Sequence, residues 1–402
     1  MSLLDYISDQ SSWIGFYDKK ADLDFMREDD ALTFFMYVRQ KKYLPVLERL
    51  TSGHGFSIPV KKLIAKEASD KKRVVYTLPE EETMVLRFLT WLMIRKYDYI
   101  FSPCLYSFRP GVTIRRAIHC LTHHKNIKNL YSYKLDISNY FNSIDISLLL
   151  SMLKEIFADD PQLYELFEKQ LSDPRAIDKG SIVCERKGVM AGLPTAVFFA
   201  NVYLTALDKA FEQIEGVIYC RYSDDIIIFA QDPETLEKAK AMLLERLEKM
   251  QLSINPAKVI QTVPGERWTF LGFSYQNGEI DVCPHSVHKL KAKMRRKARA
   301  LIRWKRVNGK DDWMAVRAFV KHFNKRLYTS EEPHEINWSR WYFPLINTDK
   351  SLKEIDAYMQ DCIRYIATET RTKSRFNFRY EQMKSLGYRS LVHEWYLPRD
   401  IK

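Results

Sequence analysis

Features that mark membrane and secreted proteins are scarce in this sequence. No apolar run approaches the roughly 20 residues that a membrane-spanning helix needs. The segment from Met1 to Asp9 carries Asp5 and Asp9 and lacks the basic start of a signal peptide. We therefore expect a cytoplasmic protein without a membrane partner.

Cysteine is also sparse, with six in 402 residues, far apart and without a CxxC pair. This spacing argues against a zinc module and against a disulfide scaffold, so buried free thiols are expected. Internal repeats, low-complexity tracts and long flexible linkers are lacking as well. The length suffices for two or three packed subdomains, and a hydrophobic content of 46% indicates a globular chain.

Positive charge, in contrast, is abundant. The formal net charge is +12 and the pI about 9.2, which favours a polyanionic partner because each neutralised phosphate releases counterions. Basic residues recur from Lys289 to Arg306 with Trp304 among them, and a second basic and aromatic stretch runs from Arg371 to Tyr380. These stretches predict a surface for nucleic acid, with a merely solvated helix as the alternative.

The expected helices come from apolar periodicity and from capping residues. A hairpin is expected over residues 64–77, where a basic turn joins two short apolar runs. Asp232 and Pro233 are a favourable N-cap and first helical position. Helices are expected within residues 1–60, over 79–95 and 195–213, after Asp232, and beyond Pro284.

The expected strands lie at 131–136, 217–222 and 226–229. The last two flank a tight turn with Asp224 and Asp225 at its tip, and Asp tolerates the unusual backbone angles of such turns. Strands and helices in this order predict an α+β fold with a mainly antiparallel sheet. We place a domain boundary near residue 280.

Three aspartates lie at the ends of these strands. Nucleotidyl transfer spreads negative charge over the reacting phosphate, and two Mg²⁺ ions held by carboxylates can stabilise the attacking and leaving oxygens. Metal binding also lets like charges lie close together. Taken singly, Asp224-Asp225 is typical of a solvated turn and Asp136 of a capping or strand-end acid. The interpretation therefore depends on their combination.

That combination resembles reverse transcriptases. Tyr222-Ser223-Asp224-Asp225 is similar to their tyrosine-x-Asp-Asp box, and the segment from Asp136 to Asp145 is similar to their first palm motif. Further similar blocks follow in family order over residues 60–280. They are the fingers motifs (Lys66, Arg73, Tyr106 to Gly111), the glycine turn and helix (Gly188 to Gly192, Ala200 to Leu204), the lysine motif (Leu252 to Lys258) and the primer grip (Phe270 to Phe273).

The resemblance implies a right-hand polymerase with an antiparallel-sheet palm. It implies an RNA-directed DNA polymerase that uses dNTPs and Mg²⁺, with Mn²⁺ as the alternative ion. The implied parts are an N-terminal helical extension (1–60), fingers (61–127 and 146–186), a palm (128–145 and 187–280) and a helical, basic thumb and C-terminal region (281–402).

The resemblance also assigns the catalytic residues. The implied metal ligands are Asp136, Ile137 (through its backbone), Asp224 and Asp225. Lys258 would protonate the departing pyrophosphate, with a plain surface lysine as the alternative. Asp145 is expected to cap the following helix.

Substrate contacts are implied by position as well. Phe141 falls where the family has its steric gate against a 2′-hydroxyl, which implies deoxynucleotide preference; a core aromatic is the alternative. Taken alone, Lys66 and Arg73 would be solvated charges. The residues expected at the nucleotide are Lys66, Arg73, Ile137, Phe141 and Gly192. Those expected at the nucleic acid are Arg109, Tyr222, Phe270, Leu271, Gly272, Lys293, Arg296 and Arg303.

One motif departs from the family pattern. Many reverse transcriptases have glutamine before the second glycine of the glycine turn, followed by a serine-proline pair. Here Ala191 takes the place of the glutamine, and the pair is Ala196-Val197. The turn at Gly192 is expected to survive, whereas the usual glutamine contacts with the nucleotide are in doubt.

The C-terminal block from Trp338 to Tyr396 resembles the tail of bacterial defence-associated reverse transcriptases. This resemblance implies antiphage defence, a structured non-coding RNA as template, and repetitive cDNA as one form of product. The sequence lacks zinc-finger spacing and a second acidic cluster with a histidine, so no RNase H or endonuclease is expected.

Three functional hypotheses stay open at this point. The first is an RNA-templated DNA polymerase. The second is untemplated or protein-primed DNA synthesis of the abortive-infection type. The third is a catalytically inactive scaffold that binds RNA, against which the presence of all three aspartates argues. A homo-oligomer or a partner protein is compatible with each of them.

Overall fold

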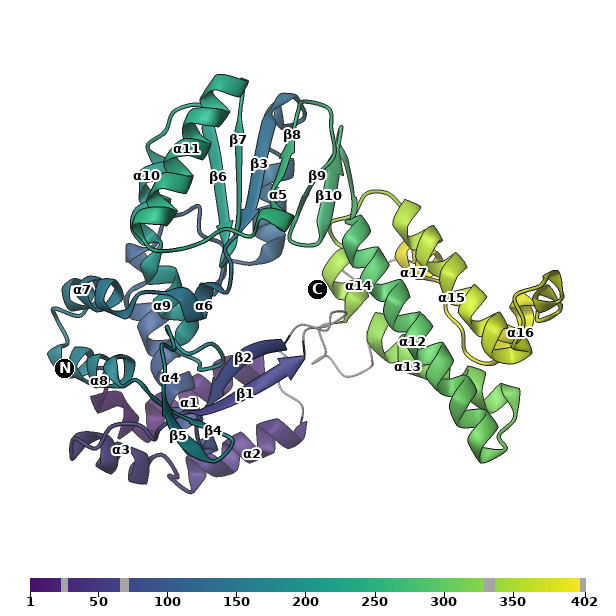
Figure 1. The fold of residues 1–402 in the computed structure, drawn as a ribbon. Helices are drawn as coiled ribbons and strands as arrows, with labels where there is room; N and C mark the ends of the chain where they lie inside the picture. Colours follow the sequence, from purple (N-terminus) through teal and green to yellow (C-terminus); the bar gives the residue numbers. More distant parts are fainter. Residues whose placement is uncertain (23–27, 66–71, 329–336, 398–402) are drawn as a thin grey trace. The chain divides into compact units, whose positions relative to one another are not determined.

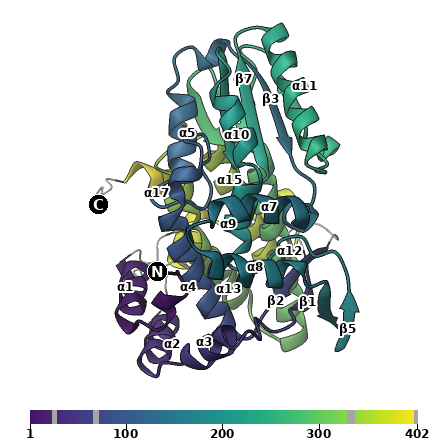
Figure 2. The same ribbon diagram turned by 90° about the vertical axis from the view of Figure 1, so that its left-hand side faces the viewer.

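The computed structural model describes residues 1–22, 28–65, 72–328 and 337–397 (Figures 1 and 2). The chain divides into two compact units, Met1–Leu271 and Gly272–Lys402. The division thus lies a few residues before the boundary that we expect near residue 280. No helix within the described ranges is both long and apolar enough to cross a membrane.

The N-terminal helices of unit 1 are joined to α4 by an aromatic cluster. Trp13 stacks on Tyr43 and on Phe88, with ring centroids 4.8 and 4.2 Å apart, and all three rings are buried. The helices expected in this region are confirmed: α1 (Gln10–Asp22), α2 (Glu28–Arg39), α3 (Leu44–Thr51) and α4 (Glu80–Lys96).

The pairing of two strands expected over residues 64–77 is confirmed, in a four-stranded sheet of the order β2-β1-β4-β5, with the first strand beginning earlier, at Val60. The turn between them, residues 66–71, lies outside the described residues. β1 and β2 are antiparallel, with Val60 opposite Thr77, whereas β1 meets β4 in parallel at Ile177. The strands are β1 (Val60–Ala65), β2 (Lys72–Thr77), β4 (Arg175–Asp178) and β5 (Ser181–Cys184).

Four further helices lie between α4 and β4 along the chain. The expected cap at Asp145 is confirmed, because its carboxylate accepts the Leu148 N–H at 3.0 Å. Asp160 caps the next helix in the same way, through the N–H of Leu163. The four helices are α5 (Ile114–Thr122), α6 (Tyr140–Ser143), α7 (Ile146–Ile156) and α8 (Pro161–Ser172).

A second sheet, in the order β6-β7-β3-β8, is antiparallel throughout. α10 and α11 pack on it (Figure 1), and α11 buries Leu236, Ala239, Leu243 and Leu247. The predicted α+β fold with an antiparallel palm sheet is confirmed. Its strands are β3 (Tyr131–Asp136), β6 (Val217–Tyr222), β7 (Asp225–Ala230) and β8 (Ile260–Thr262); α11 spans Pro233–Lys249 and β9 Trp268–Phe270.

The single helix expected over residues 195–213 is wrong. The chain instead forms α9 (Ala196–Tyr203) and α10 (Thr205–Glu212), separated at Leu204. Near the break, the carbonyl of Asn201 accepts the hydroxyl of Thr205 at 3.1 Å and the guanidinium of Arg221 at 3.3 Å. Side-chain donors of this kind compete with the helical N–H groups, which explains the interruption.

Unit 2 begins with a hairpin of β10 (Phe273–Gln276) and β11 (Glu279–Val282). The helices expected beyond Pro284 are confirmed, and α12, α13 and α15 pack on one another through buried apolar stripes. The helices of this unit are α12 (Pro284–Asn308), α13 (Asp312–Leu327), α14 (Trp338–Tyr342), α15 (Lys350–Thr368), α16 (Tyr380–Ser385) and α17 (Leu391–Tyr396).

All six cysteines are free thiols. The expectation that they are buried is confirmed for Cys220, Cys283 and Cys362. Cys104 is half-buried, and Cys120 and Cys184 are exposed on α5 and β5.

Candidate active site

Neighbouring strands bring the three predicted aspartates to one end of the palm sheet. Asp136 ends β3 and lies directly opposite Asp225, the first residue of β7. Asp225 is also paired with Tyr222, the last residue of β6. The carbonyl of Asp224 accepts the N–H of Ile137 at 3.0 Å. Backbone pairing alone therefore places the three carboxylates at one sheet edge.

The turn between β6 and β7 has its unusual backbone angle at Ser223, with φ +59°, and not at an aspartate as expected. The N–H of Ser223 donates to the hydroxyl of Ser107 at 2.9 Å, and its carbonyl accepts the guanidinium of Arg221 at 3.2 Å. The buried Ser107 hydroxyl in turn donates to Asn201. These bonds hold a left-handed serine in place and thereby orient Asp224.

A buried ion pair lies behind this turn. Arg221 donates twice to Asp208, at 2.7 and 2.5 Å, and neither side chain has any exposed surface. Tyr219 adds a third bond to Asp208 at 2.7 Å. Burial alone would lower the pKa of Arg221, but the adjacent Asp208 outweighs it and raises that pKa above its ordinary value. The arginine therefore stays charged.

Sequence analysis did not identify Arg221, Asp208 or Lys134 as part of the site. A charged residue inside a β-prone run, two positions before the turn, is the signal that could have revealed Arg221. Lys134 lies two residues before Asp136, so both side chains face the same side of β3. Its ammonium group lies 3.6 Å from the carboxylate of Asp225.

Lys258, at the end of the 3₁₀ turn Pro256–Lys258, donates to Asp136 at 2.6 Å. The structure thus brings the predicted lysine to the carboxylate cluster. Asp136 is 6% exposed, whereas the Lys258 side chain is 56% exposed. The ammonium group can therefore leave this carboxylate for solvent without disturbing the core.

The carboxylates are poorly solvated and repel one another. Burial, followed by the charges of Asp136 and Asp225, raises the pKa of Asp224 to about 6. Burial also raises the pKa of Asp225, an effect that Lys134 opposes and Asp136 strengthens. A bound cation would relieve both causes of the shift.

Within the described ranges, no three His, Cys, Asp or Glu side chains converge on one point where they could hold a metal. The carboxylates of Asp136 and Asp225 face Lys258 and Lys134 instead. The donor set nevertheless fits a hard divalent cation, since it offers only oxygens that lack sufficient countercharge. Asp136, Asp224 and Asp225 would hold that cation after Lys258 has moved off Asp136.

The raised pKa of Asp224 predicts a pH-dependent stability. Between its ordinary value of 3.8 and about 6, the folded chain holds a proton that the unfolded chain releases. The free energy of unfolding therefore falls as the pH rises through this window, and the whole decrease is present above it. Asp224→Asn removes this decrease, because its amide does not ionise. In urea unfolding with EDTA, we expect its gain over wild type to be about 2 kcal/mol larger at pH 7 than at pH 4. A gain that does not change with pH would contradict this assignment.

The glycine turn links the palm to the β1–β2 hairpin. Gly188 has φ +54°, and a Cβ there would lie 2.3 Å from the carbonyl oxygen of Phe141. At Gly192, with φ +107°, a Cβ would lie 2.8 Å from the carbonyl oxygen of Tyr76. Only glycine fits either position. The carbonyl of Ala191 accepts the Tyr76 N–H at 2.7 Å, so the turn persists without the usual glutamine.

The same turn holds in place the segment of Phe141, one of the residues expected at the nucleotide. The N–H of Val189 donates to Phe141 at 2.9 Å, and the Phe141 ring is partly buried against the core. Asn142 bonds to Ala191 and to Val74 of β2. Arg73 is exposed on β2. Lys66 lies outside the described residues.

Two residues predicted to contact nucleic acid are engaged inside the protein. Arg109 donates to Asp98 and to the carbonyl oxygens of Ser102 and Leu105. Phe270 is 1% exposed, because the alternation of β9 turns Trp268 and Phe270 inward. The Phe270 ring is thus turned away from solvent and Arg109 braces its loop, while the contacts of both residues with nucleic acid stay predictions.

The remaining predicted contacts differ in exposure. Tyr222 is half-buried beside Phe108, with ring centroids 6.1 Å apart, and Leu271 has φ +50°.

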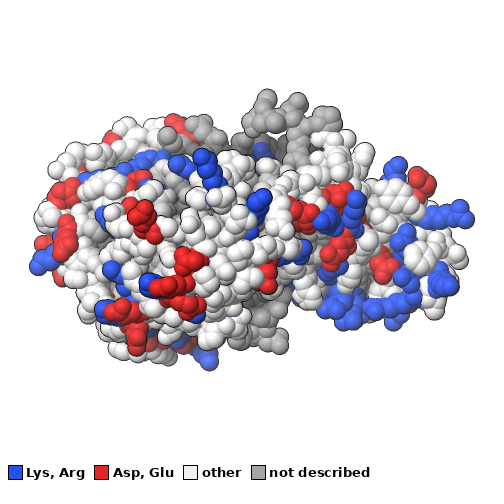
Figure 3. All heavy atoms as spheres, turned by 90° about the horizontal axis from the view of Figure 1, so that it is seen from above, with Lys and Arg blue, Asp and Glu red and all other residues white. Residues whose placement is uncertain are grey.

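In unit 2, a Cβ on Gly272 would lie 2.8 Å from the Tyr342 hydroxyl, so Gly272 serves packing. The predicted basic residues of α12 lie outside its buried stripe, and Figure 3 shows Lys and Arg gathered on the surface of unit 2. They are Lys293, Arg296 and Arg303.

An antiparallel palm sheet with three aspartates at one end, joined by a glycine turn to a second sheet, defines a palm-type nucleotidyltransferase. The family model described as "Reverse transcriptase (RNA-dependent DNA polymerase)" matches residues 64–275. The chain therefore belongs to the reverse transcriptase family. This membership confirms the predicted enzyme class, an RNA-directed DNA polymerase.

Individual relatives are distant. Protein YkfC of Escherichia coli (strain K12) is 21% identical over 265 residues, which cover 56% of this chain and 68% of that protein. Apo telomerase of Candida tropicalis is similar in structure, with a TM-score of 0.48 and 15% identity over 83% of this chain and 70% of that chain. A form of that enzyme lacking its C-terminal domain gives 0.47 and 16%, over 57% of this chain and 55% of that chain. The chain thus spans little more than half the length of the truncated telomerase.

Proposed function

We propose that this protein copies an RNA into DNA with dNTPs, with Asp136, Asp224 and Asp225 holding Mg²⁺. The observation that carries the proposal is the direct pairing of Asp136 with Asp225 beside a turn that holds Asp224. Bound Mg²⁺ would supply charge stabilisation for the transferred phosphoryl group. Mn²⁺ satisfies the same oxygen ligands and is the alternative ion.

Lys258 has two roles in this proposal. In the structure its ammonium group neutralises Asp136 at 2.6 Å. When it leaves that carboxylate, the exposed side chain can place its proton at an oxygen of the departing pyrophosphate. An ammonium group is a proton donor, as a general acid must be.

Phe141 is proposed to exclude ribonucleotides, because its backbone is held by the glycine turn and its ring cannot withdraw freely. Phe141→Ala is expected to raise incorporation of ribonucleotides relative to deoxynucleotides by roughly 10- to 100-fold, the range for steric discrimination by one side chain. Single-nucleotide primer extension measures the ratio. Phe141→Tyr retains the ring and should keep the selectivity of wild type. An unchanged ratio in Phe141→Ala would mean that the ring belongs only to the core.

The biological role that we propose is cytoplasmic antiphage defence, with a structured non-coding RNA as template. Two features support it. The block from Trp338 to Tyr396 resembles the tail of defence-associated enzymes, and the net charge of +12 suits a polyanionic partner. Repetitive cDNA is the product that this resemblance suggests.

The experiment that tests the proposal is purification from the native host together with any bound RNA. The complex is then given Mg²⁺ and labelled dNTPs, and the product is sequenced, with Asp224→Ala/Asp225→Ala as the control. DNA complementary to the bound RNA, and missing from the control, would support the proposal and identify the template. DNA unrelated to any bound RNA would favour untemplated or protein-primed synthesis. RNA bound by both proteins with no DNA made by either would favour the inactive scaffold.

A further inference from the structure

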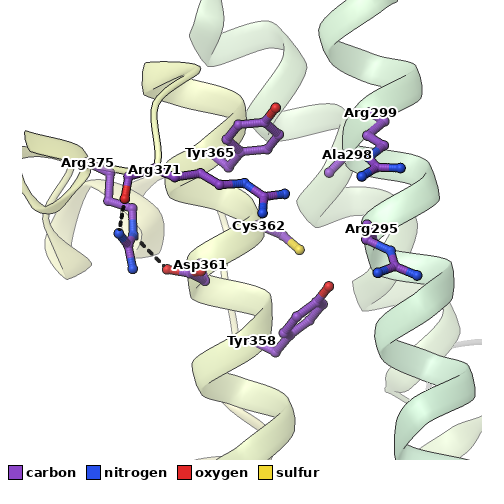
Figure 4. A pocket seen from close by; sticks show the side chains of 9 residues that line it. All are labelled: Arg295, Ala298, Arg299, Tyr358, Asp361, Cys362, Tyr365, Arg371 and Arg375. Atoms are coloured by element: carbon purple, nitrogen blue, oxygen red, sulfur yellow. Dashed lines mark hydrogen bonds and ion pairs between the residues drawn. The ribbon is translucent and has the colours of Figure 1, made fainter. Parts of the chain in front are cut away.

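A hollow of about 240 Å³ lies in unit 2 between α12, α15 and the segment that follows α15 (Figure 4). Four arginines line it, together with two tyrosines, an aspartate and a cysteine. In Figure 4 the guanidinium group of Arg371 points toward α12, while Arg375 turns away to Asp361. The full lining is Arg295, Ala298, Arg299, Tyr358, Asp361, Cys362, Tyr365, Arg371 and Arg375.

The hollow interrupts a row of ion pairs between α12 and α15. On one side of it Lys291 pairs with Glu354 at 2.5 Å, and on the other side Arg306 pairs with Glu369. Arg295 and Arg299 continue the same face of α12 at helical spacing between these pairs. Opposite them α15 places Tyr358, Cys362 and Tyr365, and its one acid in the lining, Asp361, is paired with Arg375.

The only acid of the lining is already neutralised. Asp361 binds Arg375 at 2.9 Å, and Arg375 also donates to the carbonyl of Arg371 at 2.5 Å. Within the described ranges Arg295 and Arg299 have no ion-pair partner, and Arg371 lies over the Tyr365 ring at 5.1 Å. Three guanidinium groups thus face one small hollow without a countercharge, an arrangement that an anion would stabilise.

We propose that this hollow binds a phosphate monoester, held by Arg295, Arg299 and Arg371. A monoester carries a charge of about −1.5 to −2 and three acceptor oxygens, which suit planar guanidinium groups better than the single charge of a phosphodiester does. The hydroxyls of Tyr358 and Tyr365 supply further donors. Pockets for drug-sized ligands enclose about 300–1,000 Å³, so the smaller hollow has room for a phosphate and its adjoining sugar but not for a dinucleotide cofactor.

A phosphate monoester occurs in two kinds of ligand: the 5′-phosphate end of an RNA strand and a free mononucleotide. The binding test uses the full chain in EDTA without dNTPs, so its outcome is independent of DNA synthesis. Fluorescence anisotropy compares one short single-stranded RNA with a 5′-phosphate and with a 5′-hydroxyl, both labelled at the 3′ end. The pocket variant is Arg295→Gln/Arg299→Gln. The matched control, Arg296→Gln/Arg303→Gln, removes the same charge from α12 outside the hollow.

Wild type is expected to bind the 5′-phosphorylated RNA about tenfold more tightly than the hydroxyl form. The pocket variant should lose this preference, while the control keeps it even where both RNAs bind more weakly. AMP that binds as tightly as the phosphorylated RNA would assign the hollow to mononucleotides, and AMP that competes only at far higher concentration would assign it to strand ends. The proposal is overturned if wild type shows neither the preference nor AMP binding, or if the pocket variant keeps the preference.

Discussion

Asp224→Asn is expected to lower the rate of DNA synthesis by about a thousandfold. The amide keeps the size of the side chain but removes a negative charge from the site that would hold the cation. Metal stabilisation of the transition state contributes several kcal/mol, and about 4 kcal/mol corresponds to three powers of ten in rate. Primer extension under single-turnover conditions measures the change.

Asp145→Asn is the matched control for this experiment. Asp145 lies in the motif of Asp136, but outside the carboxylate cluster, because its carboxylate caps α7 and faces Arg186 at 3.6 Å. Its replacement should cost about 1 kcal/mol of stability or less and leave the rate near that of wild type. If Asp224→Asn retained a tenth of the wild-type rate, Asp224 would not hold an essential ion. Equal RNA binding by both variants would exclude a folding defect as the cause.

Arg221→Met is expected to lower the free energy of unfolding by about 3–5 kcal/mol, the largest stability effect that we predict. The variant leaves Asp208 charged and buried without its partner, which is far costlier than losing an exposed ion pair. It also removes the donor to the Ser223 carbonyl. Urea unfolding monitored by circular dichroism measures the loss. A change below about 1 kcal/mol would show that the pair does not stabilise the fold.

A double variant separates stability from positioning. Arg221→Met/Asp208→Asn removes both charges, so much of the lost stability should return. DNA synthesis should stay impaired, because the turn at Ser223 still lacks its guanidinium donor. Recovery of both stability and activity would mean that Arg221 acts only on folding. The comparison therefore tests Arg221 as a positioning residue for Asp224.

Local sequence signals predicted the elements whose cause is local. The helix that begins at Pro233 follows from its Asp232 cap and apolar spacing, and α12 begins at Pro284 as expected. The glycine turn could be predicted for a similar reason, since positions with positive φ favour glycine. The division of residues 196–212 into two helices could not be predicted, because Arg221, distant in sequence, supplies a competing donor.

The roles of individual side chains were likewise predictable only where neighbouring residues in the sequence decide them. Spacing placed Asp136, Asp224 and Asp225 at strand ends, but it could not reveal whether an arginine or an aromatic would face solvent. Arg109 was expected at nucleic acid and holds Asp98. Phe270 was expected there too and is buried. In both cases the outcome depends on neighbours that only the folded chain brings near.

By itself, the sequence determined the class of fold and placed Asp136, Asp224 and Asp225 at strand ends, because strand periodicity, capping and turn chemistry act over a few residues. The order of the motifs and the metal-binding role of these aspartates are implied by the resemblance to reverse transcriptases. Tertiary structure alone decided the partners of those carboxylates. Lys134 and Lys258 reach them across strands, and Asp208 neutralises Arg221 behind the turn. Among the residues that the structure describes, the fold also gives Arg295 and Arg299 no ion-pair partner. Burial and electrostatic pairing depend on distances between side chains, and these are set only when the chain has folded.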